Sequence, residues 1–238
     1  DIIYLSVGIS FAIWLYIIYR YDRYEPEPVI ILILTGVAGG LMSSVPAALL
    51  NTAALSVLGP GSLFFSDADA AADSFTLLKF SLFVGFNEEI WKAAAALFIL
   101  KRLKHFNEPA DALIYSMTIA LGFAAFENIE YTLMGGLNIL VLRSITAVPL
   151  HVGLAAIWGM GIAKGKYING GRYFSVMLPY VVSAAVLHAL YNYLQFIIYS
   201  GFSLIAAVIF SLLVISHAVK KLNHFVELSP FKKENEIY

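Results

Sequence analysis

Long apolar segments separated by short polar breaks make up nearly the whole chain. The breaks are "EPEP" at 25–28, "LGPGS" at 58–62, "NEPAD" at 107–111 and "NGGR" at 169–172. Several apolar segments reach about 20 residues, the length that an α-helix needs to cross about 30 Å of hydrocarbon. They lack the alternation over about 10 residues that is typical of strands in a membrane β-barrel. The pattern therefore predicts membrane-spanning helices.

The expected fold is all-α, a polytopic membrane helix bundle of about seven transmembrane helices with room for an eighth. The first apolar run lacks the basic start and the cleavage site of a signal peptide, so it is expected to be an anchor. The longest linker, 52–75, has room for a short helix at the outer surface. We find no internal repeat or soluble region, so residues 1–238 are expected to form a single transmembrane domain. The expected spans are 2–20, 29–51, 76–100, 110–134, 138–163, 173–199 and 201–220.

Composition supports a membrane protein and excludes some chemistry. Hydrophobic residues make up 60% of the chain and charged residues only 13%, about half the usual share in soluble proteins. The mean hydropathy is +0.80. The absence of cysteine excludes disulfides, thiol nucleophiles and thiolate metal sites. The net charge of −1 gives no reason to expect a nucleic-acid partner.

Basic residues gather in alternate linkers, which predicts the orientation of the chain. By the positive-inside rule these linkers are cytoplasmic, so the C-terminus is expected inside and the N-terminus outside. Lys79 and Arg143 lie near the outer ends of their spans, where their charged groups can reach the interface. The residues that set the orientation are Arg20, Arg23, Lys101, Arg102, Lys104, Lys164, Lys166, Arg172, Lys220, Lys221, Lys232 and Lys233.

The third span carries three charged residues at its centre, in "GFNEEIWKAAAALFIL" at 85–100. Glu88, Glu89 and Lys92 would together cost on the order of 8–10 kcal/mol if they were ionised and exposed to lipid. They must therefore pair, become neutral or line a hydrated cavity. Lys92 follows Glu88 by four residues and Glu89 by three, so either ion pair fits on one helix face.

Three further spans place polar side chains at comparable depth. Pro149 stands two residues before His151, which predicts a kink that would open the helix there. A purely structural interpretation applies to part of this set, because intramembrane His and Asn side chains often form helix-to-helix hydrogen bonds worth about 0.6 kcal/mol. The added polar residues are Glu127 and Asn128 in the fourth span, His151 in the fifth, and His188 and Asn192 in the sixth.

Carboxylates and imidazoles at one depth suit three kinds of chemistry. Two His and one carboxylate can hold Zn²⁺ while another carboxylate acts as base to water. Alternatively, a glutamate activates water without metal, and His and Asn stabilise the oxyanion. The third option is ion or proton translocation along a polar path. Asn192 has a clear role only in hydrolysis, which the residues therefore favour.

Four motifs on successive spans resemble those of the PrsW family of intramembrane proteases. The stretch "YRYDRYEPEP" after the first span is also similar to that family, and the resemblance otherwise covers about 85–192. The motifs are E-E-x-x-K (Glu88, Glu89, Lys92), F-x-x-x-E-N (Phe123, Glu127, Asn128), His151 followed by small residues, and H-x-x-x-N (His188, Asn192).

The resemblance implies an intramembrane endopeptidase that cleaves a membrane-anchored protein in a prokaryotic plasma membrane. It points to site-1-type regulated proteolysis, and in the best-known member of the family the substrate is an anti-sigma factor. PrsW proteins are related to the CAAX-prenyl endopeptidases and Abi proteins. Those relatives carry His where this chain has Glu127, so prenylated substrates are not expected for this chain.

Roles follow as hypotheses from the motifs. Glu88 is expected to be the water-activating base, and Lys92 to hold Glu89. Asn192 is expected to steady the oxyanion, and Asn128 to support the site. Glu127, His151 and His188 are expected to form either a metal site or a hydrogen-bonded water site. Zn²⁺ is slightly favoured, because two His and one Glu match a catalytic zinc set.

A non-catalytic interpretation stays open beside the protease. The gamma-secretase subunit APH-1 is a distant relative of the family, and a scaffold of that kind keeps polar residues for packing. An ion or proton transporter is the other alternative, although the inverted repeats of many transporters are not found. The lipid bilayer and a protein substrate are the expected partners, and the oligomeric state is not predicted.

Overall fold

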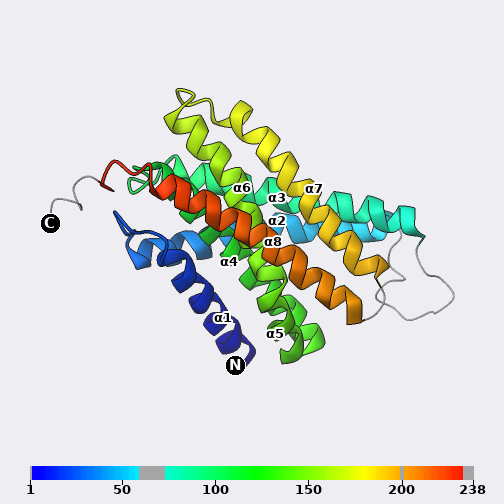
Figure 1. The fold of residues 1–238 in the computed structure, drawn as a ribbon. Coiled ribbons are helices and arrows are strands. Elements are labelled where there is room, and N and C mark those ends of the chain that lie inside the picture. Colours follow the sequence, from blue (N-terminus) through cyan, green and yellow to red (C-terminus); the bar gives the residue numbers. More distant parts are fainter. Residues whose placement is uncertain (1, 59–72, 199–200, 233–238) are drawn as a thin grey trace.

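The computed structural model describes residues 2–58, 73–198 and 201–232, and every regular element in these ranges is a helix (Figure 1). The predicted all-α polytopic bundle is confirmed. The helices are α1 (Ile2–Tyr19), α2 (Val29–Leu58), α3 (Ser74–Leu100), α4 (Pro109–Gly135), α5 (Leu137–Ile145), α6 (Ala147–Tyr167), α7 (Tyr173–Ile197) and α8 (Gly201–Val226).

Six segments of the described chain are long and apolar enough to cross a membrane: α1, α2, α4, the joined α5 and α6, α7 and α8. α3 has the length for a seventh at 27 residues. Its central charges, which set it apart from the other six, are buried inside the bundle rather than turned to the outside. We therefore infer that α3 is the seventh span. The interpretation of residues 1–238 as one domain stays a prediction.

Two boundaries differ from the expected spans. α2 continues to Leu58, seven residues beyond the predicted end of its span, and the rest of the predicted surface helix in 52–75 lies largely outside the described residues. The predicted span 138–163 is two helices that meet at Thr146. Pro149 explains this break, because it lacks an N–H and its ring would clash with the carbonyl of Ile145, four residues earlier. At the expected kink the helix is interrupted at Thr146, and Pro149 lies in the first turn of α6.

α4 and α6 form the centre of the bundle, while α1 and α8 lie at its periphery (Figure 1). Glycine allows the closest approach of α2 and α4: a Cβ on Gly122 would lie 1.8 Å from the carbonyl oxygen of Gly36. Large apolar side chains on α1, α2 and α8 remain exposed, as at Leu5, Leu49 and Leu213. An apolar outer surface of this kind is what a lipid environment requires.

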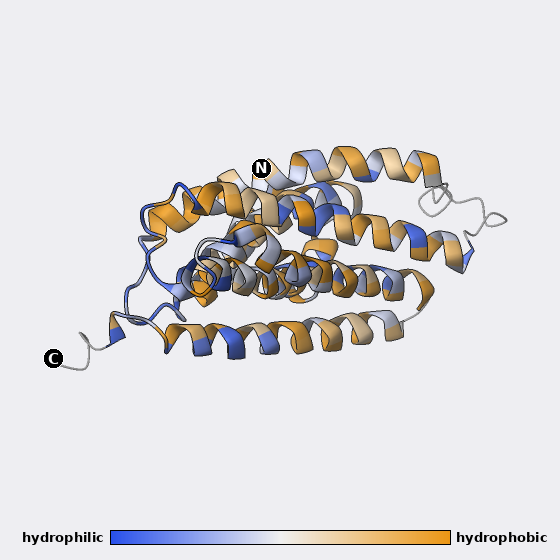
Figure 2. Ribbon diagram, turned by 90° about the horizontal axis from the view of Figure 1, so that it is seen from above, coloured by the Kyte–Doolittle hydropathy of each residue, from blue (hydrophilic) through white to orange (hydrophobic). Residues whose placement is uncertain are grey.

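One end of the bundle gathers hydrophilic residues, next to the described end of the chain near the C-terminus (Figure 2). Contacts between distant segments hold this end together: Arg23 Nη2 lies 3.1 Å from Glu227 Oε1, and Asn107 Nδ2 donates to Glu25 Oε1 at 3.0 Å. We call it the basic end, because the basic linkers meet there. Its assignment to the cytoplasm stays a prediction from the positive-inside rule.

Candidate active site

α3 presents its charged residues to the inside of the bundle. The helix starts at a capped turn, in which the Asp73 carboxylate accepts the backbone N–H groups of residues 75 and 76. Its buried positions include Gly85, Glu88, Lys92 and Ala96, which repeat every three or four residues along one face. Glu88, Glu89 and Lys92 therefore lie on the side of α3 that packs inside the bundle, where α3 contacts α4, α6 and α7.

Lys92 lies at the centre of the cluster and is fully buried. Its Nζ donates to Glu89 Oε1 at 2.8 Å and to Glu88 Oε2 at 3.3 Å. It also donates to His151 Nδ1 at 2.8 Å and lies 4.0 Å from the centre of the Phe123 ring. One ammonium group thus compensates two buried carboxylates, which confirms that these charges pair rather than face lipid.

Both imidazoles are oriented by a carboxylate. His188 Nδ1 donates to Glu89 Oε1 at 2.9 Å, which leaves His188 Nε2 facing Glu88 Oε2 at 3.8 Å. His151 accepts from Lys92 at Nδ1, so its Nε2–H donates to Glu127 Oε2 at 3.0 Å. These tautomers are assigned from the partners. A carboxylate that holds the outer nitrogen of a histidine is the arrangement that surrounds many metal-binding imidazoles.

Arg143 belongs to the site, which corrects the expectation that it reaches the membrane interface. Its Nη2 donates to Glu127 Oε2 at 2.5 Å and its Nε donates to Asn128 Oδ1 at 2.7 Å. The guanidinium also stacks on the Tyr131 ring at 4.0 Å. The short helix α5 therefore supplies the cation that fixes the carboxylate behind His151.

Three further residues of the site were missed by the sequence analysis. Trp158 Nε1 donates to Glu89 Oε2 at 3.0 Å, and Asn51 Nδ2 donates to Glu88 Oε1 at 3.1 Å. Asn87 Nδ2 in turn donates to Asn51 Oδ1 at 2.8 Å. The sequence pattern that could have identified these three residues is a side chain capable of hydrogen bonding inside or next to a long apolar run.

Asn192 is not joined to the cluster by a hydrogen bond. It is half-buried on α7, one turn after His188. Within the described part of the chain its side chain makes no hydrogen bond. Its role at the oxyanion stays a prediction.

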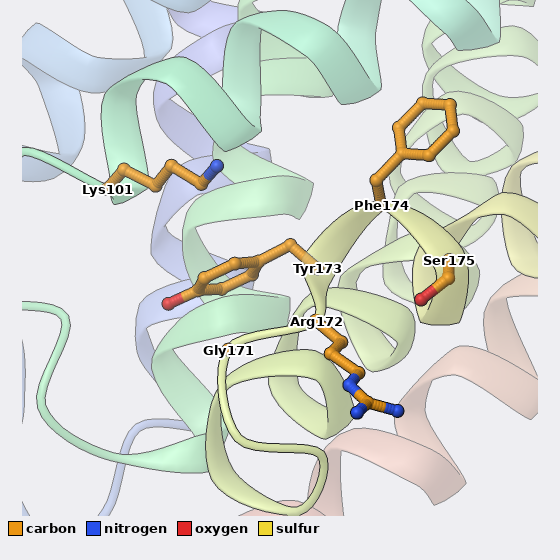
Figure 3. Close-up of a pocket in the computed structure, with 6 residues that line it drawn as sticks. All are labelled: Lys101, Gly171, Arg172, Tyr173, Phe174 and Ser175. Atoms are coloured by element: carbon orange, nitrogen blue, oxygen red, sulfur yellow. The ribbon is translucent and has the colours of Figure 1, made fainter.

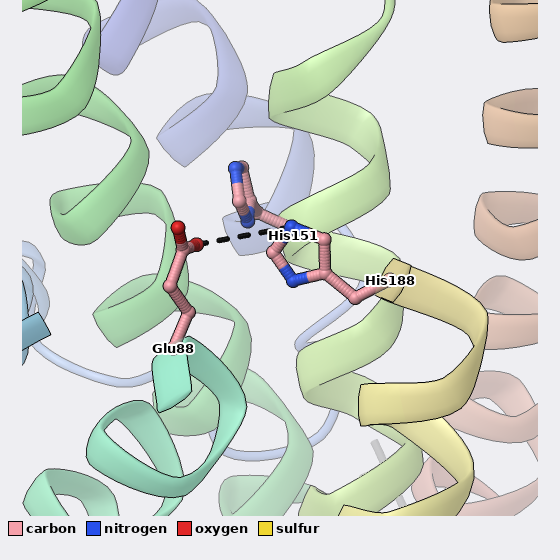
Figure 4. A group of neighbouring side chains, drawn as sticks. All are labelled: Glu88, His151 and His188. Atoms are coloured by element: carbon pink, nitrogen blue, oxygen red, sulfur yellow. Dashed lines mark ion pairs between the residues drawn. The ribbon is translucent and has the colours of Figure 1, made fainter. Parts of the chain in front are cut away.

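Glu88, His151 and His188 form one of the groups in the described residues that could hold a metal ion (Figure 4). One donor atom from each lies within 4.8 Å of the others, and all three residues are buried. Figure 4 shows the carboxylate of α3 pointing toward the two imidazoles, with the His188 contact dashed. The predicted metal set named Glu127 instead of Glu88. In the structure, Glu127 Oε2 is already taken by Arg143 and by His151.

Two surface hollows lie outside this cluster. One, of about 350 Å³, is at the start of α7 and is lined by Lys101, Arg172 and Tyr173 among others (Figure 3). It lies about 22 Å along α7 from His188, at 1.5 Å per residue. The other hollow, of about 380 Å³, lies between α2 and α3 and is almost wholly apolar. We call it the α2–α3 groove, and it is lined by Leu50, Phe83, Phe86, Asn87, Ile90 and Trp91.

Comparison with known proteins identifies the family. The model of the PrsW family intramembrane metalloprotease matches residues 27–218. The chain belongs to the PrsW family. The match extends well past the four motifs and includes seven of the eight described helices in whole or in large part.

Curated relatives named Protease PrsW support this membership of the PrsW family. The Clostridioides difficile protein is 27% identical over 215 residues, which cover 83% of this chain and 80% of the relative. The Geobacillus kaustophilus protein is 32% identical over 111 residues, and the Bacillus subtilis protein 26% over 110. These two alignments span about half of each relative, 47% and 50%. No solved structure matches the chain. The chain is thus a multi-pass membrane protein of a protease family.

Proposed function

We propose that the chain hydrolyses a peptide bond of a membrane-anchored protein, with water activated between Glu88 and the two imidazoles. The observation that carries the proposal is the buried group of Glu88, His151 and His188. The outer nitrogen of each ring is held by a separate carboxylate, Glu127 or Glu89. This division of roles leaves Glu88 as the carboxylate that is directed at the reacting water.

The donor set fits Zn²⁺, which catalytic sites commonly bind through two His and one Glu. Glu88, His151 and His188 would hold it, in place of the Glu127 set expected from the sequence. When bound, zinc supplies Lewis acidity that polarises a carbonyl and makes water a better nucleophile. His151 Nδ1 accepts from Lys92, so this hydrogen bond and metal ligation by the same nitrogen exclude each other.

The surrounding residues orient and compensate the reacting groups. Glu89 fixes His188, and Glu127 with Arg143 fixes His151, so both rings keep one nitrogen toward Glu88. In a version without metal, Glu88 itself takes the proton of the attacking water. Asn192, one turn after His188, is proposed to donate to the oxyanion.

The α2–α3 groove is proposed to receive the transmembrane segment of the substrate. Its apolar lining suits a lipid-exposed helix, and Asn87 at its wall connects through Asn51 to Glu88. An unwound peptide entering there would reach the catalytic carboxylate. The first substrates to test are single-pass proteins, with anti-sigma factors as the leading class by the family resemblance.

The central experiment is cleavage of tagged single-pass substrates by the purified chain in detergent. Glu88→Gln is expected to reduce cleavage by about 10²–10⁴-fold, the usual worth of an acid–base group. Glu130→Gln is the matched control, since Glu130 is exposed near the far end of α4. Equal rates for wild type and Glu88→Gln would exclude Glu88 as the base. If His188→Ala also cleaves as wild type does, the chain is a scaffold and any cleavage comes from a contaminant.

Metal content decides between the two versions of the mechanism. The zinc version predicts about one ion per chain in elemental analysis of freshly purified protein, and loss of both metal and cleavage after chelation. Added Zn²⁺ should restore cleavage to the wild type and not to His188→Ala. Active protein without bound metal would favour the version in which Glu88 acts alone.

A further inference from the structure

A second group of acidic side chains lies at the basic end, away from the candidate active site. It consists of Asp22, Glu25 and Glu27 from the α1–α2 linker and Asp111 from the first turn of α4, and we call it the basal carboxylate cluster. Asp111 is 0% exposed and Glu27 3%. Asp111 is separated from Glu127 by about 24 Å along α4, at 1.5 Å per residue. The cluster therefore has no contact with the catalytic groups.

Each member of the cluster is anchored by one of its two oxygens. Asp111 Oδ2 accepts the backbone N–H groups of Asn107 and Glu108, both at 2.8 Å. Asp22 Oδ2 accepts the backbone N–H of Glu27 at 2.7 Å. Glu27 Oε2 accepts from the Tyr115 hydroxyl. Glu25 Oε1 accepts from the Asn107 amide. These bonds fix the direction of all four carboxylates.

The second oxygen of each carboxylate is buried and has no hydrogen-bond partner within the described residues. These atoms are Asp22 Oδ1, Glu25 Oε2, Glu27 Oε1 and Asp111 Oδ1. One oxygen from each of Glu25, Glu27 and Asp111 lies within 4.8 Å of the others. A buried carboxylate oxygen without a partner is costly, and several side by side repel one another. The arrangement requires a positive charge that these side chains do not supply.

Among the described residues, the cationic side chains nearby make no hydrogen bond to the unpartnered oxygens. His105 Nδ1 lies 3.5 Å from Glu27 Oε2, the oxygen that is already bonded, and its side chain is 43% exposed. Lys166 Nζ donates to the Phe106 carbonyl. Burial raises the pKa of Asp22 to about 7 and that of Glu27 to about 7. Burial thus disfavours the ionised form of these carboxylates, and a bound cation would favour it.

We propose that Glu25, Glu27 and Asp111 bind a divalent cation that prefers oxygen ligands, Ca²⁺ or Mg²⁺, and that this ion ties the α1–α2 linker to the start of α4. Carboxylate oxygens are the ligands of these hard cations, whereas the imidazole-containing group of the active site suits zinc. Asp22, whose Oδ2 accepts the backbone N–H of Glu27, is proposed to hold a water molecule of the ion. The site is structural and separate from catalysis.

The test measures cation binding to the full chain in detergent after chelation and dialysis. Equilibrium dialysis with Ca²⁺, and separately with Mg²⁺, is expected to give one ion per chain for one of the two. At an ion concentration of about 100 times the Kd, the melting temperature should rise by roughly 5–10 °C. The ion that produces the larger shift identifies the preferred cation.

Two variants and a matched control make the outcome decisive. Asp111→Asn keeps an oxygen that can accept both backbone N–H groups, and Glu25→Gln keeps the acceptor for Asn107, so both preserve the anchoring bonds. Each should weaken binding at least tenfold and lose most of the thermal shift. Glu227→Gln removes an exposed carboxylate at the same end and should bind as wild type does. The proposal is overturned if neither ion binds to wild type, or if both variants bind as tightly as Glu227→Gln.

Discussion

Replacing Arg143 by Met tests whether α5 exists to hold the carboxylate behind His151. The substitution keeps much of the apolar stem and removes the guanidinium. Glu127 Oε2 then loses its donor at 2.5 Å, and Asn128 Oδ1 loses its donor at 2.7 Å. Among the described residues, the imidazole N–H at 3.0 Å is then the hydrogen-bond donor that remains to the carboxylate.

The size of the effect follows from the burial of the pair. Removing one partner of a fully buried ion pair costs about 3–5 kcal/mol. The side chains of Arg143 and Glu127 are 16% and 18% exposed, so water recovers part of that loss. We expect Arg143→Met to lower the free energy of unfolding by about 2–3 kcal/mol. Cleavage should fall by roughly 10–100-fold, as for other residues that orient a ligand or base.

The assay is a double-mutant cycle with Glu127→Gln, read by unfolding in mixed detergent micelles. If the pair is coupled, the double variant should be more stable than the sum of the single effects by about 1–3 kcal/mol. Arg23→Met is the control, because Arg23 pairs with Glu227 at an exposed surface. It should change the free energy of unfolding by less than about 1 kcal/mol. The reasoning fails if Arg143→Met costs no more than Arg23→Met, or if the single effects simply add.

Two further predictions concern the packing and the support of the site. A Cβ on Gly85 would lie 2.6 Å from the α7 backbone. Gly85→Ala should therefore separate α3 from α7, lower the free energy of unfolding by about 1–3 kcal/mol and reduce cleavage. The control is Gly8→Ala, where a Cβ meets open space, and it should change neither the free energy of unfolding nor cleavage. Trp158→Phe removes the donor to Glu89 at 3.0 Å while keeping a ring, and should cost about 1.5–3 kcal/mol in unfolding; an unchanged unfolding free energy would show that this bond is dispensable.

Six of the seven expected spans followed from length and apolarity alone, whereas α3 carries buried central charges and the expected span 138–163 is divided into two helices. The ends were less certain, since α2 continues through residues that read as a linker. Pro149 predicted a disturbance of the helix near Thr146, but the sequence did not indicate how large the disturbance would be. A proline can bend a helix or end it, and here α5 and α6 are separate helices, with α5 packed against α4 and α6.

The depth of the polar residues was predictable, whereas their pairing was not. Counting along each span placed Glu88, His151 and His188 at one level, and the structure groups these three. Which carboxylate faces which ring depends on the rotation of each helix about its axis, and that rotation is set by contacts such as the one at Gly85. For the same reason Arg143 was expected at the interface, although α5 turns it inward to Glu127.

The basal carboxylate cluster was not predicted either, because it joins segments that are far apart in the sequence. "EPEP" and "NEPAD" appeared as breaks between spans, and "EPEP" also as part of the stretch that resembles the PrsW family, so neither segment was assigned a chemical role. Glu27 and Asp111 are 84 positions apart, and neither segment has a pattern that predicts contact with the other. They meet because α1 and α2 both pack on α4, which brings the first linker over the start of that helix.

The distribution of donors within the buried cluster supports the proposal that Glu88 is the reactive carboxylate. Glu89 receives three donors, from Lys92, an imidazole and an indole. Glu127 receives a guanidinium and the other imidazole on a single oxygen. Glu88 receives an amide at 3.1 Å and an ammonium at 3.3 Å, so its donors are the most distant of the three sets. Three carboxylates also face only two permanent cations, Lys92 and Arg143. One further positive charge, from a metal ion or a proton, is therefore needed, and Glu88 is the carboxylate best placed to take it.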